Sequence, residues 1–370
     1  MEINCSVKEL LDGVRDVKSA VPGRTTLPVL SSFLVEAVAS GLKMTSTDMQ
    51  IGVRRDLKAE VKTEGAVAIP AKKFGELLSS LPESENIKIS MGKENSVILR
   101  CGKSRFTMQV YDRKEYPLVP EHQTKDVVSF SADDLLDMLE RVSIAVSPDE
   151  ARYVLCGVSW KAEGGNLRMA ATDGRRMAML TKGGIPSDLD FNVIIPTKMV
   201  SEMTTKLDLF KDDKTKVDVS ISKNSISFQA PNIYIVSRLL EGSYPKVESV
   251  VPAKTKETIL VPRIPLLDIV KRAALCAPDR GGSIKFKFGK GKVGVSSEST
   301  AMSCDEEVDA EGDADRETNF DPRYVVDGLR SIVSEKVQIK LAEAANSAVL
   351  IEPVGDNPIN HLYVVMPMRS

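Results

Sequence analysis

The sequence predicts an α+β protein built from three consecutive copies of one unit, each with two helices packed on antiparallel strands. Two observations predict this fold class. A Leu-Leu pair inside an amphipathic stretch recurs at intervals of 125 and 131 residues, and a proline that precedes a second helix recurs at intervals of 126 and 126 residues. Self-similarity at a nearly fixed interval is the signature of a repeated structural unit.

The first helix of each copy is expected over residues 6–21, 131–146 and 261–275, where apolar residues recur at helical spacing. The Leu-Leu pairs within these segments begin at Leu10, Leu135 and Leu266. Ser131 is a good N-cap residue, and the two aspartates that follow it suit the positive end of a helix dipole. Each copy is therefore predicted to begin with an amphipathic helix.

A strand hairpin follows each first helix, over residues 42–53, 169–180 and 292–303. In the second copy the turn is Thr172-Asp173-Gly174, because glycine tolerates a positive φ and an aspartate side chain can accept hydrogen bonds from its own backbone. In the third copy the turn is expected at Ser297-Glu298-Ser299, so its chemistry has diverged.

The second helix of each copy is expected over residues 71–81, 197–207 and 323–332, after an apolar strand that ends at Pro70, Pro196 or Pro322. Proline suits a helix start because the first turn needs no amide donor there. Alternating strands over 87–110, 217–240 and 337–368 close the copies. The predicted domains are residues 1–122, 127–250 and 253–370.

The composition is that of a soluble globular protein, with 42% hydrophobic and 28% charged residues and no apolar run long enough to cross a membrane. The first residues lack the pattern of a secretory signal, so a cytoplasmic location is expected. The five cysteines are scattered and show no Cys-x-x-Cys spacing. They are expected to be small buried hydrophobic residues rather than disulfide partners or metal ligands.

The net charge of −2 hides an uneven distribution. Residues 305–317 hold eight acids and one arginine, a local charge of −7, so the rest of the chain carries +5. Such a run is expected to be a solvated strand edge and loop. The remaining, mildly basic body could face an anion.

The residues of common catalytic sites are scarce. The two histidines, His122 and His361, stand in no nucleophile motif. Residues 289–294 match Gly-x-Gly-x-x-Gly, but they are expected to join two strands rather than to open a helix. We predict no catalytic residue, no metal site and no cofactor.

One enzymatic alternative stays open. Asp173 with Arg175 and Arg176 could form a catalytic group, for instance in a hydrolase. A turn with a solvated ion pair explains the same three residues more simply.

A nucleic-acid partner is indicated only by scattered cations. The second helices begin with Lys72 and Lys73, Lys198 and Arg323, and further basic points are Arg24, Arg152 and Lys206. Aromatic residues make up only 5% of the chain, so platforms for stacking single-stranded bases are few. Any bound DNA is expected to be held by its phosphates, without sequence preference.

Four segments together carry a resemblance to a known family: Arg24-Thr-Thr-Leu-Pro-Val-Leu30, Ala171-Thr-Asp-Gly-Arg-Arg-Met-Ala178, Tyr244-Pro245 and Tyr363-Val-Val-Met-Pro-Met-Arg369. In these segments and in its triplication, the chain resembles the bacterial β sliding clamps, the processivity subunits of DNA polymerase III. The resemblance covers the whole chain.

The resemblance implies a ring of six clamp domains, formed by two protomers joined head to tail, with helices around a hole that double-stranded DNA threads. It implies a non-catalytic protein that needs no cofactor. Its implied partners are the DNA polymerase III catalytic subunit, a clamp loader complex, and other polymerases and repair proteins with a clamp-binding peptide. A clamp paralogue specialised for repair or carried by a mobile element is the alternative.

The resemblance also implies site residues. A partner-peptide groove between the second and third domains is expected at Leu155, Thr172, Gly174, Arg175, Arg176, Met177, Pro245, Val250, Val364, Met366, Pro367, Met368 and Arg369. DNA contacts are expected at Arg24, Arg152, Tyr153 and Lys198, and the dimer contact at Phe106, Met108, Leu275 and Cys276. Arg175 stands where many members have histidine, Met177 where they often have leucine, and Ser370 where an apolar residue is common.

Overall fold

The computed structural model describes residues 1–121, 127–211, 214–252, 254–278, 281–344 and 347–368. The predicted boundary residues 122, 253 and 370 therefore lie outside the described residues. The chain divides into two units, one of Met1–Leu136 with Ser201–Leu239 and the other of Asp137–Val200 with Leu240–Ser370. The second copy thus contributes strands to both units.

The first copy contains helices α1 (Val7–Val17) and α2 (Ala71–Ser79), 3-10 helices η1 (Lys18–Ala20), η2 (Pro28–Ser31) and η3 (Arg113–Glu115), and strands β1 (Glu2–Ser6), β2 (Ser32–Val38), β3 (Gly41–Thr47), β4 (Ile51–Leu57), β5 (Glu60–Thr63), β6 (Gly65–Pro70), β7 (Asn86–Met91), β8 (Ser96–Cys101), β9 (Ser104–Gln109) and β10 (Tyr111–Asp112). Helix α1 packs against α2 and against β4.

The second copy contains helices α3 (Ala132–Ser143) and α4 (Thr197–Leu207), 3-10 helices η4 (Glu150–Leu155) and η5 (Asp208–Phe210), and strands β11 (Val127–Ser131), β12 (Gly157–Glu163), β13 (Asn166–Thr172), β14 (Arg176–Gly183), β15 (Phe191–Pro196), β16 (Lys216–Ile221), β17 (Ser225–Ala230) and β18 (Ile233–Arg238).

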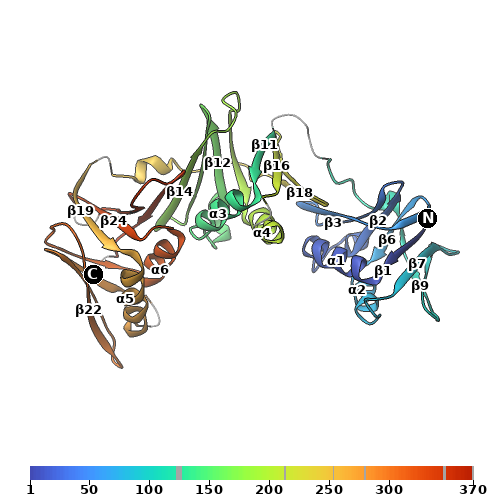
Figure 1. Cartoon of the computed structure of the whole chain (residues 1–370), viewed down its shortest axis with the longest axis horizontal. Coiled ribbons are helices and arrows are strands. Elements are labelled where there is room, and N and C mark those ends of the chain that lie inside the picture. Colours follow the sequence, from blue (N-terminus) through green and yellow to red (C-terminus); the bar gives the residue numbers. More distant parts are fainter. Residues whose placement is uncertain (122–126, 212–213, 253, 279–280, 345–346, 369–370) are drawn as a thin grey trace. The chain divides into compact units, whose positions relative to one another are not determined.

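The third copy contains helices α5 (Arg263–Cys276) and α6 (Pro322–Ser331), and strands β19 (Thr255–Pro262), β20 (Ile284–Gly289), β21 (Lys292–Glu298), β22 (Ser303–Asp309), β23 (Arg316–Phe320), β24 (Lys336–Ala342), β25 (Val349–Pro353) and β26 (Ile359–Val365). The 3-10 helix η6 (Val247–Val250) lies in the segment that leads into it. Helix α5 packs against α6 and against β21 and β22 (Figure 1).

The strands form four antiparallel sheets, and two of these sheets join neighbouring copies. In the first unit a nine-stranded sheet runs β10-β6-β2-β3-β4-β18-β17-β16-β11, beside a five-stranded sheet β5-β1-β7-β8-β9. In the second unit an eight-stranded sheet runs β15-β12-β13-β14-β26-β25-β24-β19, beside a four-stranded sheet β22-β21-β20-β23. Strand β4 therefore pairs with β18 and strand β14 with β26.

All six predicted helices are present, and five of them have shifted ends. Helix α4 has the predicted bounds, whereas α1 ends at Val17 and continues as the 3-10 helix η1. Helix α5 begins at Arg263, because Val261 and Pro262 still belong to β19. The sequence did not predict the short strand that leads directly into each first helix, since no turn separates β1, β11 or β19 from the helix that follows.

The three predicted hairpins are confirmed as β3–β4, β13–β14 and β21–β22. The third turn was placed too early, because Ser297 and Glu298 still pair with the opposite strand. Ser299 closes the turn instead: its amide donates to the carbonyl oxygen of Met302 at 2.9 Å. The glycine-rich stretch 289–294 joins β20 to β21, as predicted.

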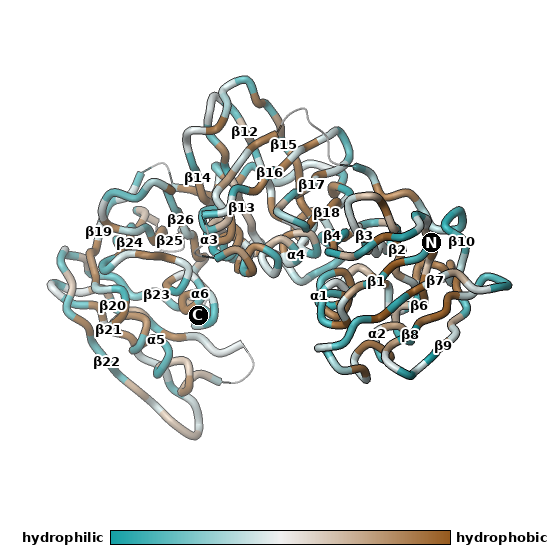
Figure 2. The backbone as a smooth tube through the Cα atoms, turned by 45° about the vertical axis from the view of Figure 1, so that its right-hand side comes forward, coloured by the Kyte–Doolittle hydropathy of each residue, from teal (hydrophilic) through white to brown (hydrophobic). Residues whose placement is uncertain are grey.

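The acidic run begins in β22, which is an edge strand of the four-stranded sheet. Exposed and half-buried residues alternate along it, with Asp305, Glu307 and Asp309 exposed. The prediction of a solvated strand edge is thus confirmed. Hydrophilic residues dominate β22, whereas hydrophobic ones dominate inner strands such as β6 (Figure 2).

Three of the five cysteines match the prediction of burial, namely Cys5, Cys101 and Cys276. It is wrong for Cys156 and Cys304, which are half-buried. Among the described residues, no group of three or more His, Cys, Asp or Glu side chains could hold a metal ion. No helix in the described part of the chain is both long and apolar enough to span a membrane.

Candidate functional site

The turn between β13 and β14 is held by Asp173. One carboxylate oxygen of Asp173, Oδ1, accepts hydrogen bonds from the backbone amides of Arg175 at 2.9 Å and Arg176 at 3.0 Å. The other, Oδ2, accepts from Arg176 Nε at 3.0 Å. Gly174 has a φ of +85°, which glycine adopts without the strain of a side chain. Asp173 is 6% exposed and serves the turn, so its geometry gives no support to a catalytic role.

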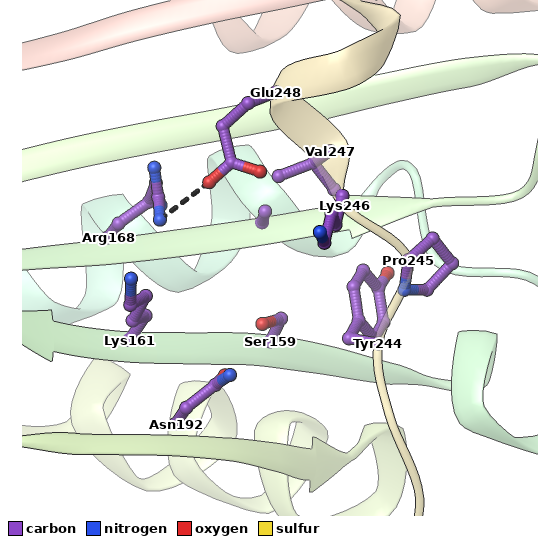
Figure 3. A pocket seen from close by; sticks show the side chains of 10 residues that line it. Ser159, Lys161, Arg168, Asn192, Tyr244, Pro245, Lys246, Val247 and Glu248 are labelled. Carbon is purple, nitrogen blue, oxygen red and sulfur yellow. Dashed lines mark ion pairs between the residues drawn. The ribbon is translucent and has the colours of Figure 1, made fainter.

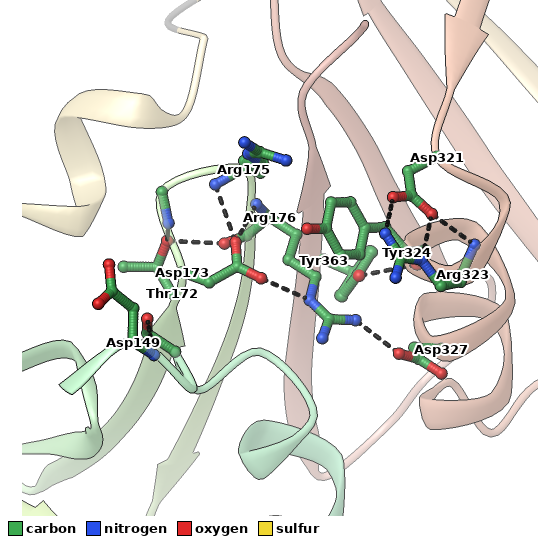
Figure 4. Close-up of polar contacts among 12 residues, drawn as sticks. Asp149, Thr172, Asp173, Arg175, Arg176, Asp321, Arg323, Tyr324, Asp327 and Tyr363 are labelled. Carbon is green, nitrogen blue, oxygen red and sulfur yellow. Dashed lines mark hydrogen bonds and ion pairs between the residues drawn. The ribbon is translucent and has the colours of Figure 1, made fainter. Parts of the chain in front are cut away.

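Arg176 ties this turn to the second helix of the third copy (Figure 4). Its Nη1 lies 2.6 Å from Oδ2 of Asp327 on α6, and its guanidinium stacks on the Tyr324 ring, 4.5 Å from the centroid. Burial opposes the charge of Arg176, but the hydrogen bond to Asp327 helps to raise the pKa of the guanidinium. The arginine therefore stays charged and links β14 to α6.

The end of the chain lies along the same hairpin. Strand β26 pairs with β14, so that Met177 stands opposite Val364. Beyond the strand, the amide of Met366 donates to the carbonyl oxygen of Arg175 at 2.9 Å, and the amide of Met368 donates to Asn319 at 2.8 Å. Backbone hydrogen bonds thus hold the predicted tail residues beside the predicted turn residues.

An apolar cluster forms where the hairpin and the tail meet. Its buried members are Ala170, Met177, Val247, Ala348, Leu350, Leu362 and Val364, and Met179, Tyr244, Val251 and Met366 pack against it half-buried. We call this set the apolar cluster. It brings together the predicted residues Met177, Val364 and Met366. The half-buried methionines are unbranched and polarizable, which suits a surface that fits several apolar partners.

The segment before η6 is anchored over the hairpin by Tyr244. The backbone amide of Thr172 donates to the Tyr244 hydroxyl at 2.9 Å. Burial raises the pKa of Tyr244 to about 12, so the hydroxyl is neutral at physiological pH. Pro245 and Val250 are exposed on either side of Val247, which is buried in the apolar cluster.

Several members of the cluster were missed from the sequence, including Met179, Leu362 and Tyr244. A signal for two of them existed. Met179 is two residues from Met177 on β14, and Leu362 is two residues from Val364 on β26, so each pair shares a face of its strand. The predicted Leu155 is 7% exposed at the end of η4 and is not a member of the apolar cluster.

A cavity of about 350 Å³ adjoins the apolar cluster (Figure 3). It is lined by Ser159, Lys161, Arg168, Ala170, Asn192, Tyr244, Pro245, Lys246, Val247 and Glu248. Ala170, Tyr244 and Val247 belong to both the cavity and the cluster. The two therefore adjoin, and together they carry both apolar and charged side chains.

Comparison with known proteins matches the chain along almost its full length. The models of the DNA polymerase III beta subunit match residues 1–120 as its N-terminal domain, 129–246 as its central domain and 248–369 as its C-terminal domain. The chain belongs to the DNA polymerase III beta subunit family. The recognition of this family and its triplicated fold from the sequence is confirmed.

Individual relatives agree with this family. The chain is 28% identical to the beta sliding clamp of Bacillus subtilis (strain 168) and 27% identical to that of Chlamydia muridarum, covering 100% of this chain in both cases and 100% and 99% of the relatives. Among solved structures, the DNA polymerase sliding clamp from Bacillus subtilis matches with a TM-score of 0.94 and 27% identity, over 100% of this chain and 99% of that one. A sliding clamp from Pseudomonas aeruginosa bound to griselimycin matches with a TM-score of 0.92 and 28% identity, over 100% of both chains.

The residues that are expected to contact DNA, from the resemblance to beta subunits, have exposed side chains. Arg24 lies in the bend before η2, Lys198 in the first turn of α4, and Tyr153 in η4 with 52% exposure. Arg152 has a further contact, because its Nη1 donates to the carbonyl oxygen of Asp173 at 2.9 Å. Arg152 therefore also supports the hairpin turn.

Some of the basic side chains already form ion pairs within the chain. Lys206 is 4% exposed and its Nζ lies 3.4 Å from Asp16, so it is a buried ion pair rather than a free surface cation. Arg323 pairs with Asp321 at 2.6 Å, although its side chain remains largely exposed. These ion pairs leave less positive charge available for DNA than the sequence alone suggests.

The four residues that are expected at the dimer contact differ in how far they are exposed to solvent. Phe106 and Met108 are half-buried on β9, an edge strand, and Leu275 at the end of α5 is 75% exposed. Cys276 is fully buried and so has no surface with which to touch a second protomer. Arg369, predicted for the groove, lies outside the described residues.

Proposed function

We propose that this chain is a replication clamp whose homodimer encircles double-stranded DNA and holds DNA polymerase III to its template. The observation that carries the proposal is the β14–β26 pairing in a member of this family, because it places the Thr172–Arg176 turn beside the chain's last strand and forms the apolar cluster between them. The clamp itself performs no chemistry, so it needs neither a catalytic residue nor a cofactor.

The apolar cluster and its rim are the proposed docking site for short peptides of the polymerase catalytic subunit, the clamp loader, and other polymerases and repair proteins. Half-buried Met179 and Met366 and exposed Val250 offer apolar surface to such a peptide. Arg175 adds an exposed cation beside them, since only its backbone is used by the turn. Thr172, Gly174 and Arg176 act chiefly by shaping that turn.

Contact with DNA is proposed through exposed cations that are few and dispersed, including Arg24 and Lys198. Phosphate contacts carry no base information, and a small number of them gives weak, salt-sensitive binding. Such contacts attract a duplex without fixing its position. This is what sliding along DNA requires.

Dimer formation is proposed through the free edges of two sheets. Strands β9 and β22 are both edge strands, with one side unpaired within the described residues. Exposed Arg105 on β9 and exposed Asp305 and Glu307 on β22 give the two edges opposite charge. Because unpaired edges favour strand addition, β9 of one protomer can pair with β22 of the next, head to tail.

This pairing gives the acidic run a second use. We also propose that the exposed carboxylates of this run repel DNA from the surface that carries them. The predicted cytoplasmic location, the ATP-driven clamp loader and the domain limits 1–122, 127–250 and 253–370 are likewise part of this proposal.

Removal of the tail tests the docking site. A chain that lacks residues 366–370 should still form dimers but should no longer stimulate DNA polymerase III, because the rim of the apolar cluster is gone. The measurements are product length on primed circular DNA with a clamp loader, and sedimentation equilibrium. The control is Met91→Ala, a 43% exposed methionine at the end of β7, which should behave as the wild type.

Two results would contradict the proposal: full stimulation without the tail, or loss of the dimer together with the tail. The same assay addresses the alternative of a paralogue specialised for repair or a mobile element. Strong stimulation of the replicative polymerase supports the replication clamp, and stimulation of repair polymerases alone supports the paralogue.

A further inference from the structure

Four charged side chains line the cavity beside the apolar cluster. Lys161 on β12 and Arg168 on β13 project from the sheet, and Lys246 and Glu248 reach it from the segment that crosses above (Figure 3). Among these lining residues three are cations and one is an anion. The cavity therefore favours a negatively charged group.

Not all of this positive charge is neutralised by internal ion pairs. Arg168 pairs with Glu248 at 2.7 Å, and Lys161 pairs with Glu163 at 2.5 Å. Lys246 forms no ion pair with another described residue. Glu163 and Glu248 are also the more exposed partners, with side-chain exposures of 69% and 52%, so both carboxylates can be displaced into solvent.

The position of the cavity limits what can occupy it. It shares Ala170, Tyr244 and Val247 with the apolar cluster, so a chain segment seated on the cluster reaches the cavity within a few residues. Ser159 and Asn192 add a hydroxyl and an amide on the floor of the cavity. Hydrogen-bond donors beside unpaired positive charge suit a carboxylate.

We propose that this cavity is a second subsite of the docking surface, and that it binds an acidic residue flanking the apolar motif of a partner peptide. The inference rests on the proposed docking function, and it adds a preference for an acidic residue next to the apolar motif. Lys246 and Lys161 are the residues that recognise the carboxylate. Glu248 opposes binding of this carboxylate, since it forms an ion pair with Arg168.

The test compares two versions of one peptide. A fluorescein-labelled clamp-binding peptide from a bacterial DNA polymerase III catalytic subunit is made with neutral Gly-Ser flanks, and again with a Glu-Glu flank at one end or the other. Fluorescence anisotropy with the full chain should show one acidic version binding about five-fold more tightly at low salt, as a partly exposed ion pair allows. The gain should shrink at high salt, because the charges are screened.

Substitutions in the cavity test whether the tighter binding of the acidic peptide arises there. Lys161→Gln with Lys246→Gln should remove the gain and leave the affinity for the neutral peptide unchanged. Glu248→Gln should enlarge the gain, because it releases Arg168. Lys290→Gln, an exposed lysine in the β20–β21 turn, is the matched control and should change nothing.

Each contrary result has a distinct meaning. If the neutral peptide binds and neither acidic flank improves its affinity, or if the gain survives Lys161→Gln with Lys246→Gln, the subsite is refuted while the docking function stands. If neither the neutral nor the acidic peptides bind, the docking function fails, and the subsite with it.

Discussion

Arg176 shows how one side chain can define a site without being its contact surface. It bonds Asp173 within its own turn and Asp327 on α6, and it lies over Tyr324. Its side chain is only 12% exposed. The arginine thus fixes the hairpin relative to the third copy, and exposed Arg175 beside it is free to meet a partner.

The members of the apolar cluster could be predicted in part from the sequence. Matching the terminal Met-Pro-Met-Arg segment to a known family selected Val364 and Met366, which the structure places at the apolar cluster. The role of Tyr244 could not be found this way, because it depends on a hydrogen bond to Thr172, 72 residues earlier in the chain. A contact between distant segments leaves no local pattern in the sequence.

His361 predicts how stability depends on pH. It is fully buried on β26, next to the charge of Arg141, and neither ring nitrogen has a hydrogen-bond partner among the described residues. Burial, with a smaller effect of Arg141, lowers the pKa of His361 from 6.5 to about 3. Between these values the unfolded chain binds a proton that the folded chain rejects. Below pH 6.5, this histidine therefore reduces the free energy of unfolding, by about 1.4 kcal/mol per pH unit.

Urea unfolding at pH 7 and pH 5 measures this effect. The wild type should lose more stability over this interval than His361→Leu, which removes the titrating group while keeping an apolar side chain. Carboxylates contribute equally to both proteins and cancel in the comparison. An identical pH slope in the two proteins would show that His361 is not held neutral in the fold.

Among the elements, α6 approaches β26 unusually closely at Gly328. A Cβ atom at Gly328 would lie 2.3 Å from Cε1 of Tyr363, which is fully buried and whose hydroxyl donates to the Tyr324 carbonyl oxygen at 2.8 Å. The glycine is therefore required by packing and not by its φ angle. The same helix carries Asp327, which Arg176 bonds from the hairpin beside β26.

The second helix of the first copy provides a matched comparison. A Cβ at Gly75 would lie 3.5 Å from Val14 Cγ1, which is an ordinary contact. Gly75→Ala should stabilise the protein by up to about 1 kcal/mol through helix propensity. Gly328→Ala should destabilise it by about 1–3 kcal/mol, because Tyr363 must move. Calorimetric unfolding measures both variants, and a change of the same sign in the two would contradict this account of α6.

The elements show which features are local and which are not. The helices could be predicted because their apolar spacing and their prolines are local signals, and the repeat reinforces each of them. The short strands before the first helices could not, since β1 forms only by pairing with the distant β5 and β7. The close approach at Gly328 likewise depends on a strand from the end of the chain.

For the whole molecule, the pairing of sheet edges is the decisive property. Within the chain, β4 pairs with β18 and β14 with β26, so each junction between copies is a continuous sheet. The proposed dimer extends this arrangement to two protomers, with β9 of one pairing with β22 of the next. Leu275, 75% exposed at the end of α5, is the apolar residue that such a contact is expected to cover.

The most direct test of a closed ring is its retention on DNA of different topology. Labelled protein is loaded with a clamp loader and ATP onto a nicked circular plasmid, separated from free protein by gel filtration, and followed before and after one restriction cut. A ring should stay on the circle and leave within minutes once the DNA is linear, because it slides off the ends. Loss at equal rates from circular and linear DNA, or retention on linear DNA with free ends, would contradict the clamp.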